Sequence, residues 1–312
     1  MKTVLLTGAT GFIGGAVLRS LHDSGFSIAS LVRDSRSLSS FEQKERHLWL
    51  HIGNAKQWIA SCRPSAVIHI ATAYGIHEPV SEVFRTNVLL PLQLLEQSAK
   101  AGCSLFINTD TFYSKPEFAY EHLAAYIRSK KQFIETAQIF LQQHSEIQFA
   151  NLRLEHVYGE RDKPSKFVPS LLTNLANGVE KIAMTDGQQQ RDFVHVDDVA
   201  KAFAFVAMNG TQQQCQIKEY QIGRGETMSI KQFAMLARQI TGSKTKLDFG
   251  ALPQRGGEIP YSVANISAIQ ELGWHPTITV EEGLRRVIHG GLLTTAPAEL
   301  SGRSSTLGST DT

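Results

Sequence analysis

Short apolar runs alternate with longer amphipathic stretches along the first half of the chain. The short runs are bounded by glycine or polar residues, which is typical of buried strands, whereas the longer stretches repeat their apolar residues at helical spacing. We expect strands at about residues 4–7, 28–33, 47–52, 66–71, 105–108 and 147–154, and helices at about 14–24, 55–62, 78–100 and 118–144. This alternation predicts an α/β fold with a doubly wound parallel sheet and right-handed crossovers.

The rhythm loosens after residue 154. A loop rich in Asp, Lys and Pro precedes a helix at about 167–177, and residues 190–199 indicate a strand, an N-cap and the start of a helix. Two further helices are expected at about 229–241 and 280–289. We therefore predict three regions: a first domain (1–155), a smaller lobe with some segments returning to the first domain (156–289), and a disordered tail rich in Ser, Thr, Gly and Ala (290–312).

A glycine-rich turn follows the first strand directly. Gly8, Gly11 and Gly14 have the spacing Gly-x-x-Gly-x-x-Gly and lead into a helix. Such a turn lets the backbone approach a pyrophosphate at the helix N-terminus, where free N–H groups attract anions. The alternative is a tight turn that only permits close helix–strand packing, but the order strand, turn, helix favours dinucleotide binding.

The end of the second strand indicates which dinucleotide is bound. An acid about 20 residues past the glycines would bind the ribose 2′-hydroxyl of NAD, whereas an arginine suits the 2′-phosphate of NADP. Arg33 occupies this place, and the adjacent Asp34 would point to the opposite side of a strand. Arg33 as a plain surface charge is the alternative; the pattern favours NADPH/NADP.

Tyr126 and Lys130 are four residues apart in the expected helix at 118–144, so they share one helix face. A lysine ammonium group beside a phenol lowers the pKa of the phenol, which would let the tyrosine exchange a proton with a substrate oxygen. A half-buried tyrosine packed on a lysine stem is the structural alternative.

Together these segments resemble the extended short-chain dehydrogenase/reductase family, of the NAD-dependent epimerase/dehydratase type. The resemblance spans about residues 1–289 and rests on residues 7–14, Asn87, the Tyr126/Lys130 pair, and the segments 153–159 and 191–199. It implies a Rossmann-type sheet with a smaller C-terminal substrate lobe, and an oxidoreductase acting on a nucleotide sugar. It also implies a homodimer formed through the two long helices.

The resemblance assigns residues to three roles. The catalytic set is Thr109, Tyr126 and Lys130. The cofactor set, which also includes Tyr126 and Lys130, is Gly8, Thr10, Gly11, Phe12, Ile13, Gly14, Arg33, Asn54, Ala71 and Asn87. The substrate set is Tyr74, Asp110, Thr111, His156, Phe167, Arg191, Arg255 and Glu258, with the two arginines on the pyrophosphate.

Two departures narrow the expected activity. The family's 4,6-dehydratases carry Thr-Asp-Glu where this chain has Thr109-Asp110-Thr111, so the elimination base is missing. His156 stands where the family usually has Asn. With this histidine, the segment 153–159 resembles that of the branch whose members reduce CDP-4-dehydro-3,6-dideoxy-D-glucose with NADPH to make a sugar for lipopolysaccharide O-antigen. The C4 configuration of the product stays open, and a 4-epimerase or a non-enzymatic NADP sensor are the more distant alternatives.

Composition agrees with a globular enzyme. The 312 residues are 42% apolar and 19% charged, and no apolar run reaches the ~18 residues of a membrane span. A formal net charge of +2 gives no field that would recruit nucleic acid or a membrane surface. Cys62, Cys103 and Cys215 lack metal-site spacing, so we expect no metal and a reducing, cytoplasmic location.

Overall fold

The structure is a computed structural model that describes residues 2–34, 46–118, 120, 122–211, 217–254 and 256–292. It divides into two compact units. The first unit comprises Met1–Leu154, Asp197–Ile222 and Asn265–His275, and the second comprises Glu155–Val196, Gly223–Ala264 and Pro276–Thr312.

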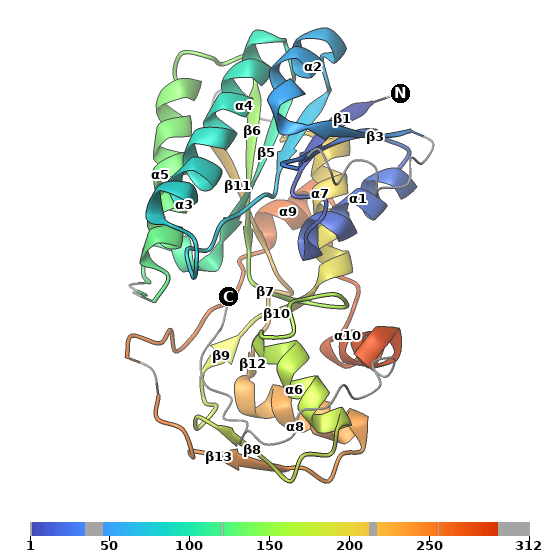
Figure 1. Ribbon diagram of the computed structural model, residues 1–312, viewed down its shortest axis with the longest axis vertical. Helices are drawn as coiled ribbons and strands as arrows, with labels where there is room; N and C mark the ends of the chain where they lie inside the picture. Colours follow the sequence, from blue (N-terminus) through green and yellow to red (C-terminus); the bar gives the residue numbers. More distant parts are fainter. Residues whose placement is uncertain are drawn as a thin grey trace. The chain divides into compact units, whose positions relative to one another are not determined.

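A seven-stranded sheet forms the centre of the first unit (Figure 1). Its order is β11-β6-β5-β4-β1-β2-β3, and every neighbouring pair is parallel. The strands are β1 (Thr3–Thr7), β2 (Ser27–Val32), β3 (His47–His51), β4 (Ala66–His69), β5 (Leu105–Thr111), β6 (Gln148–Leu154) and β11 (Ile217–Ile222). The predicted doubly wound parallel sheet is confirmed, although sequence analysis did not predict β11.

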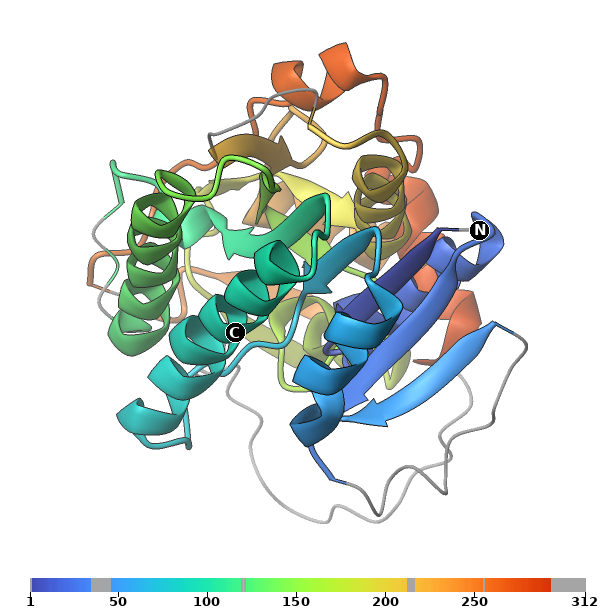
Figure 2. The same cartoon turned by 90° about the horizontal axis from the view of Figure 1, so that it is seen from above.

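Helices of the first unit cover the sheet. They are α1 (Phe12–Asp23), α2 (Ala55–Cys62), α3 (Val80–Phe84), α4 (Leu90–Lys100), α5 (Ala124–Leu141), α7 (Val196–Asn209) and α9 (Ser267–Leu272). Figure 2 shows α2, α4 and α5 along one face of the sheet. Phe106 and Phe149 of the sheet belong to one core cluster with Leu94 of α4 and Phe133 of α5. Crossovers through α1 and α4 run in opposite directions along the sheet, so right-handedness places these helices on opposite faces.

The helix predicted at 78–100 is not continuous. Between α3 and α4 the chain forms a π-helical segment, η3 (Arg85–Leu89). Pro91 has no N–H with which to bond the carbonyl of Asn87, and the hydrogen-bond ladder widens at this point. The predicted helix at 118–144 is also shorter, because regular structure starts only at Ala124.

In the second unit, the residues that the structure describes form short strand pairs and three helices. β7 (His156–Tyr158) pairs with β10 (Phe193–His195), β8 (Lys181–Met184) with β13 (Lys246–Phe249), and β9 (Gln190–Arg191) with β12 (Met228–Ser229). The helices are α6 (Phe167–Ala176), α8 (Ile230–Thr241) and α10 (Val280–Val287), and a π turn, η5 (Ile288–Leu292), follows α10. Stacked Phe193 and Phe233 lie in the core, with ring centroids 4.0 Å apart.

The helix expected to start within residues 190–199 is α7, which begins at Val196, so Asp197 and Asp198 lie in its first turn. Ser229 is the N-cap of α8 and forms a capping box with Gln232. None of the helices in the part of the chain that the structure describes is long and apolar enough to cross a membrane.

Candidate active site

The glycine turn after β1 leaves no room for side chains. Gly8 has φ +74°, and a Cβ there would lie 2.7 Å from the amide nitrogen of Ala71. A Cβ on Gly14 would lie 2.0 Å from the carbonyl oxygen of Gly8, and the Gly11 amide donates to that oxygen at 2.9 Å. The first turn of α1 therefore presents bare backbone at its N-terminus, an arrangement that fits a dinucleotide pyrophosphate.

Thr7 fastens this turn to the neighbouring strand. Its Oγ1 accepts hydrogen bonds from the amides of Ile70 and Ala71, both at 3.0 Å, and lies 3.0 Å from Nδ1 of His69. β1 and β4 are the adjacent strands at which the crossovers change direction, the place where ligands bind in open α/β sheets. Burial and the charge of Lys130 hold the pKa of His69 well below its usual value, so this histidine is neutral.

Tyr126 lies in the first turn of α5, within an aromatic cluster. Its ring centroid is 5.0 Å from that of Tyr74, and its hydroxyl is hydrogen-bonded to the side chain of Thr111. Burial raises the pKa of Tyr126 well above its ordinary value, and the hydrogen bond from Thr111 opposes this only in part. The sequence-based prediction of a lowered pKa is therefore wrong for this structure, because desolvation, together with the neighbouring Tyr74 and Asp110, raises the pKa.

Lys130 faces the sheet one turn further along α5. Its Nζ donates to the carbonyl oxygen of Thr109 at 2.8 Å and to Oγ1 of Thr72 at 3.2 Å, and lies 6.0 Å from the Tyr126 ring centroid. The predicted shared helix face is thus confirmed. Burial lowers the pKa of Lys130 to about 8, and the negative charge of Asp110 opposes that shift.

The end of β5 carries the three polar residues predicted to meet the substrate. Thr109 donates its hydroxyl hydrogen to the carbonyl oxygen of His69 at 2.8 Å, so in this conformation it has no hydrogen left to donate to a ligand. Thr111 is the hydroxyl residue that contacts Tyr126. Asp110 is buried and forms an ion pair with Nε of Arg153 at 3.0 Å. The 3-10 turn η4 (Phe112–Ser114) follows.

Asn87 connects the loop after β4 to α5. Its Oδ1 accepts from the amide of Ala73 at 2.9 Å, while Nδ2 donates to the Ala73 carbonyl at 2.7 Å and to Oγ of Ser129 at 2.9 Å. Ser129 in turn donates to the carbonyl oxygen of Tyr126 at 2.7 Å. The π turn η3 therefore places Asn87 where it holds the active-site end of α5, and its predicted contact with the cofactor stays a prediction.

The other residues predicted to bind the cofactor lie on segments that follow β1, β2 and β3. Thr10 is exposed in the glycine turn, and Phe12 and Ile13 form the first turn of α1. Arg33 follows β2 and is exposed, and Asn54 is exposed at the end of the short turn η2 (Ile52–Asn54) after β3. All of these segments begin at the carboxyl ends of strands, which meet at one edge of a parallel sheet.

The second unit holds the remaining residues that were predicted to bind the substrate. Arg191 is buried; its Nη1 donates to the carbonyl of Gln190 at 2.9 Å, and its Nη2 lies 3.6 Å from Oε1 of Glu258. The same Glu258 oxygen accepts from Nε2 of Gln189 at 2.7 Å. Arg191 and Glu258, both predicted substrate residues, thus form an ion pair. Arg255 lies outside the described residues.

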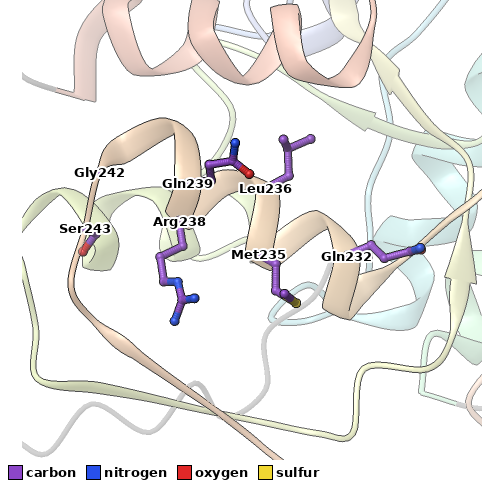
Figure 3. A pocket seen from close by; sticks show the side chains of 7 residues that line it. All are labelled: Gln232, Met235, Leu236, Arg238, Gln239, Gly242 and Ser243. Atoms are coloured by element: carbon purple, nitrogen blue, oxygen red, sulfur yellow. The ribbon is translucent and has the colours of Figure 1, made fainter.

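His156 and Phe167 are on different elements of the second unit. His156 is in β7, with its ring 5.9 Å from that of Phe193, and Phe167 begins α6 with its ring 6.0 Å from Phe233. A separate pocket of about 570 Å³ runs along α8 (Figure 3). It is lined by Gln232, Met235, Leu236, Arg238, Gln239, Gly242 and Ser243, none of which was predicted as a site residue.

Sequence analysis missed four residues that shape this site: Thr72, Ser129, His69 and Arg153. Thr72 contacts Lys130, and Ser129 contacts Asn87. The carbonyl oxygen of His69 accepts a hydrogen bond from the hydroxyl of Thr109. Arg153 is the cross-strand partner of Asp110. The register of β5 on β6 pairs Asp110 with Arg153, but the sequence pattern alone does not fix the register between neighbouring parallel strands.

The chain is similar to known proteins in both sequence and fold. A model of the NAD dependent epimerase/dehydratase family matches residues 4–223. A CDP-abequose synthase of Salmonella muenchen is 35% identical over 289 residues, covering 92% of this chain and 97% of that protein. A second, from Salmonella typhimurium, is 34% identical and covers 91% of this chain and 97% of that protein.

Among solved structures, UDP-glucose 4-epimerase of Thermotoga maritima with UDP-glucose superposes with a TM-score of 0.78 at 24% identity. The match covers 92% of this chain and 97% of that one.

Proposed function

The chain belongs to the NAD dependent epimerase/dehydratase family, and on that premise we propose that it is an NADPH-dependent nucleotide-sugar 4-ketoreductase. Its substrate is CDP-4-dehydro-3,6-dideoxy-D-glucose and its product CDP-abequose, a sugar donor for O-antigen. The observation that carries the proposal is the Tyr126–Lys130 pair, held against the end of β5 beside Thr111. The two relatives named CDP-abequose synthase, at 35% and 34% identity, support the assignment of the substrate.

In the proposed reaction, the protein's own residues transfer a proton while the C4 ketone is reduced. The bound dinucleotide supplies the hydride that reaches C4 of the sugar. Because burial raises the pKa of Tyr126, the phenol carries its proton at neutral pH and donates it to the C4 oxygen as negative charge develops there. The charge of Lys130 then stabilises the phenolate, which must recover a proton before the next turnover.

The sequence at β5 argues against elimination. A 4,6-dehydratase needs a second carboxylate two residues after Thr109, and this chain has Thr111 there. Thr111 instead contacts the Tyr126 hydroxyl. This supports a net reduction, for which a fresh reduced cofactor is required at each turnover.

NADPH is proposed in preference to NADH because of Arg33. Its guanidinium, exposed after β2, suits a 2′-phosphate on the adenosine ribose. In the second unit, we assign Arg191 and Arg255 to the substrate pyrophosphate, with Glu258 orienting Arg191. Tyr74, Thr111, His156 and Phe167 complete the proposed substrate contacts, and a cytoplasmic homodimer is the proposed working form.

The test incubates the purified protein with CDP-4-dehydro-3,6-dideoxyglucose and either NADPH or NADH, and identifies the product by NMR. We expect NADPH oxidation with stoichiometric CDP-abequose, and a markedly lower kcat/KM with NADH. CDP-paratose as the product would reverse the stereochemical assignment at C4. Turnover of a UDP- or dTDP-4-ketosugar without turnover of the CDP-sugar would refute the substrate, and equal kcat/KM for both cofactors would remove the argument from Arg33.

A further inference from the structure

Asp110 stands between the two residues that contact the Tyr126–Lys130 pair. The carbonyl oxygen of Thr109, part of the peptide that joins it to Asp110, accepts from Nζ of Lys130 at 2.8 Å. On the other side, the side chain of Thr111 is hydrogen-bonded to Tyr126. Any movement of Asp110 would therefore displace both contacts at once.

One carboxylate oxygen of Asp110 fixes this stretch of chain. Oδ2 accepts from Nε of Arg153 at 3.0 Å and from Nδ2 of Asn151 at 3.1 Å, and it also accepts from Oγ of Ser114 at 2.8 Å. Oγ of Ser114 is in addition 2.7 Å from the carbonyl oxygen of Thr111. Charge-assisted bonds of this kind are stronger than neutral ones, so the end of β5 is held from three directions.

Arg153 extends the anchor across the sheet. It is the register partner of Asp110 on β6, and its Nη1 donates to Oε1 of Glu219 on β11 at 2.7 Å. The side chain of Asp110 is 1% exposed and that of Arg153 13%. The carboxylate is therefore shielded from solvent, and the guanidinium of Arg153 is its cationic partner.

We propose that Asp110, paired with Arg153, is a positioning residue: it holds the Thr109 carbonyl and the Thr111 side chain against Lys130 and Tyr126, and places a fixed negative charge beside both. In this role it acts through the catalytic pair and makes no contact with the reacting atoms of the sugar. The consequence for reaction rate rests on the proposed function, but the positioning itself does not.

The electrostatics agree with the geometry. Burial is the largest influence on both partners, raising the pKa of Tyr126 and lowering that of Lys130 to about 8. Asp110 raises the pKa of each, so its charge favours the protonated form of both side chains. The titratable and charged groups around the pair come from several elements: Tyr74 after β4, His69 on β4, Tyr113 on η4, Arg153 on β6 and Glu219 on β11.

The direct test is a titration of Lys130 by NMR in protein labelled with ¹³Cε-lysine, with the signal assigned by its loss in Lys130→Met. In Asp110→Asn we expect the Lys130 pKa to fall by about one unit from the wild-type value, because a nearby opposite charge has been removed. Asp110→Glu keeps the charge, so its Lys130 pKa should lie close to the wild-type value. An Asp110→Asn titration that superimposes on the wild type would overturn the proposal.

Asp162→Asn is the matched control. Asp162 is also a buried carboxylate, paired with Nζ of Lys166 at 3.2 Å in the second unit, and it is not among the groups that shift the pKa of Lys130. Its substitution should leave the Lys130 titration unchanged. A shift equal to that of Asp110→Asn would show a general effect of removing a buried charge, and would count against Asp110.

The rate measurement examines positioning separately from charge. Ser114→Ala keeps the carboxylate but removes one of its anchors, so kcat should fall about 3- to 10-fold at unchanged KM for NADPH and with an unaltered Lys130 titration. Wild-type kcat in Ser114→Ala would overturn the positioning role even if Asp110→Asn failed to fold. A wild-type protein that does not reduce the CDP-ketosugar would defeat the proposed function alone, since the Lys130 titration needs no substrate.

Discussion

At the scale of single residues, the charge of Lys130 sets the pH range of the proposed reaction. Its pKa of about 8 is low because of burial, so the ammonium form dominates below that pH and the neutral amine above it. Tyr126, whose pKa is raised, keeps its proton across the same range. We expect kcat to decrease as pH rises through about 8, measured as NADPH oxidation at saturating substrate.

Lys130→Met gives the reference for that experiment. It should lower kcat at every pH and abolish the alkaline decrease, because the titrating group is gone. A wild-type profile that stays level through the same pH range would contradict the assignment of this group.

The two threonines of β5 are expected to differ in what their loss affects. Thr111→Val removes the hydroxyl that contacts Tyr126, and we expect kcat to fall about 10- to 100-fold with little change in the melting temperature. Thr109→Val removes a buried hydrogen bond to His69, which should cost about 1 kcal/mol of folding free energy with a smaller effect on kcat. A larger loss of kcat in Thr109→Val than in Thr111→Val would instead support the catalytic role that the sequence predicts for Thr109.

What the sequence could predict about residues was limited to spacing. Four residues on a helix place Tyr126 and Lys130 on one face, and the structure agrees. The sign of the Tyr126 pKa shift was not accessible, because it depends first on burial and then on neighbours such as Tyr74, which come from other segments. Burial of a side chain by distant segments leaves no mark on its local pattern.

At the scale of elements, the glycine turn makes a sharp prediction about close packing. Gly14→Ala would place a Cβ 2.0 Å from backbone that cannot move away, whereas the nearest atom to a Cβ on Gly15 is 3.5 Å distant. We expect Gly14→Ala to weaken NADPH binding at least 10-fold and to lower the melting temperature, with binding measured by calorimetry.

Gly15→Ala, in the same helix, should bind NADPH normally and gain up to about 1 kcal/mol of stability, because alanine is the better helix former. Equal losses in both variants would show that helix composition, and not contact with the Gly8 carbonyl, controls the turn.

Element types were more predictable than their ends. The strands and helices of residues 3–154 follow from apolar periodicity, but η3 interrupts an apolar pattern that is continuous through it. The cause is one missing N–H at Pro91, which a periodicity argument does not weigh. β5 extends to Thr111 because its polar end pairs with β6, and polar residues gave no strand signal.

At the scale of the whole molecule, each unit is assembled from separate stretches of chain. The first unit needs Asp197–Ile222 and Asn265–His275 in addition to Met1–Leu154. Sequence analysis expected some late segments to return to the first domain but could not say which. β11, with its half-buried Ile-Lys-Glu-Tyr-Gln-Ile pattern, has no long apolar run to mark it as part of the large sheet.

The fragment 1–154 should therefore not behave as an independent domain. Without β11, the hydrogen-bonding edge of β6 is unpaired, and an exposed edge of this kind promotes association between chains. We expect the fragment to aggregate at concentrations at which the full chain stays dispersed, as measured by size-exclusion chromatography with light scattering. A monodisperse fragment with a cooperative melting transition would contradict this.

The position of β11 also has a consequence for the order of events on the ribosome. β6 emerges early, but the strand that covers it cannot be delivered until residues 155–216 have been translated. During that interval the growing chain carries a nearly finished sheet with one open border. Codon-level pauses within that stretch would lengthen the vulnerable period, so the yield of intact protein should depend on translation speed there more than elsewhere in the gene.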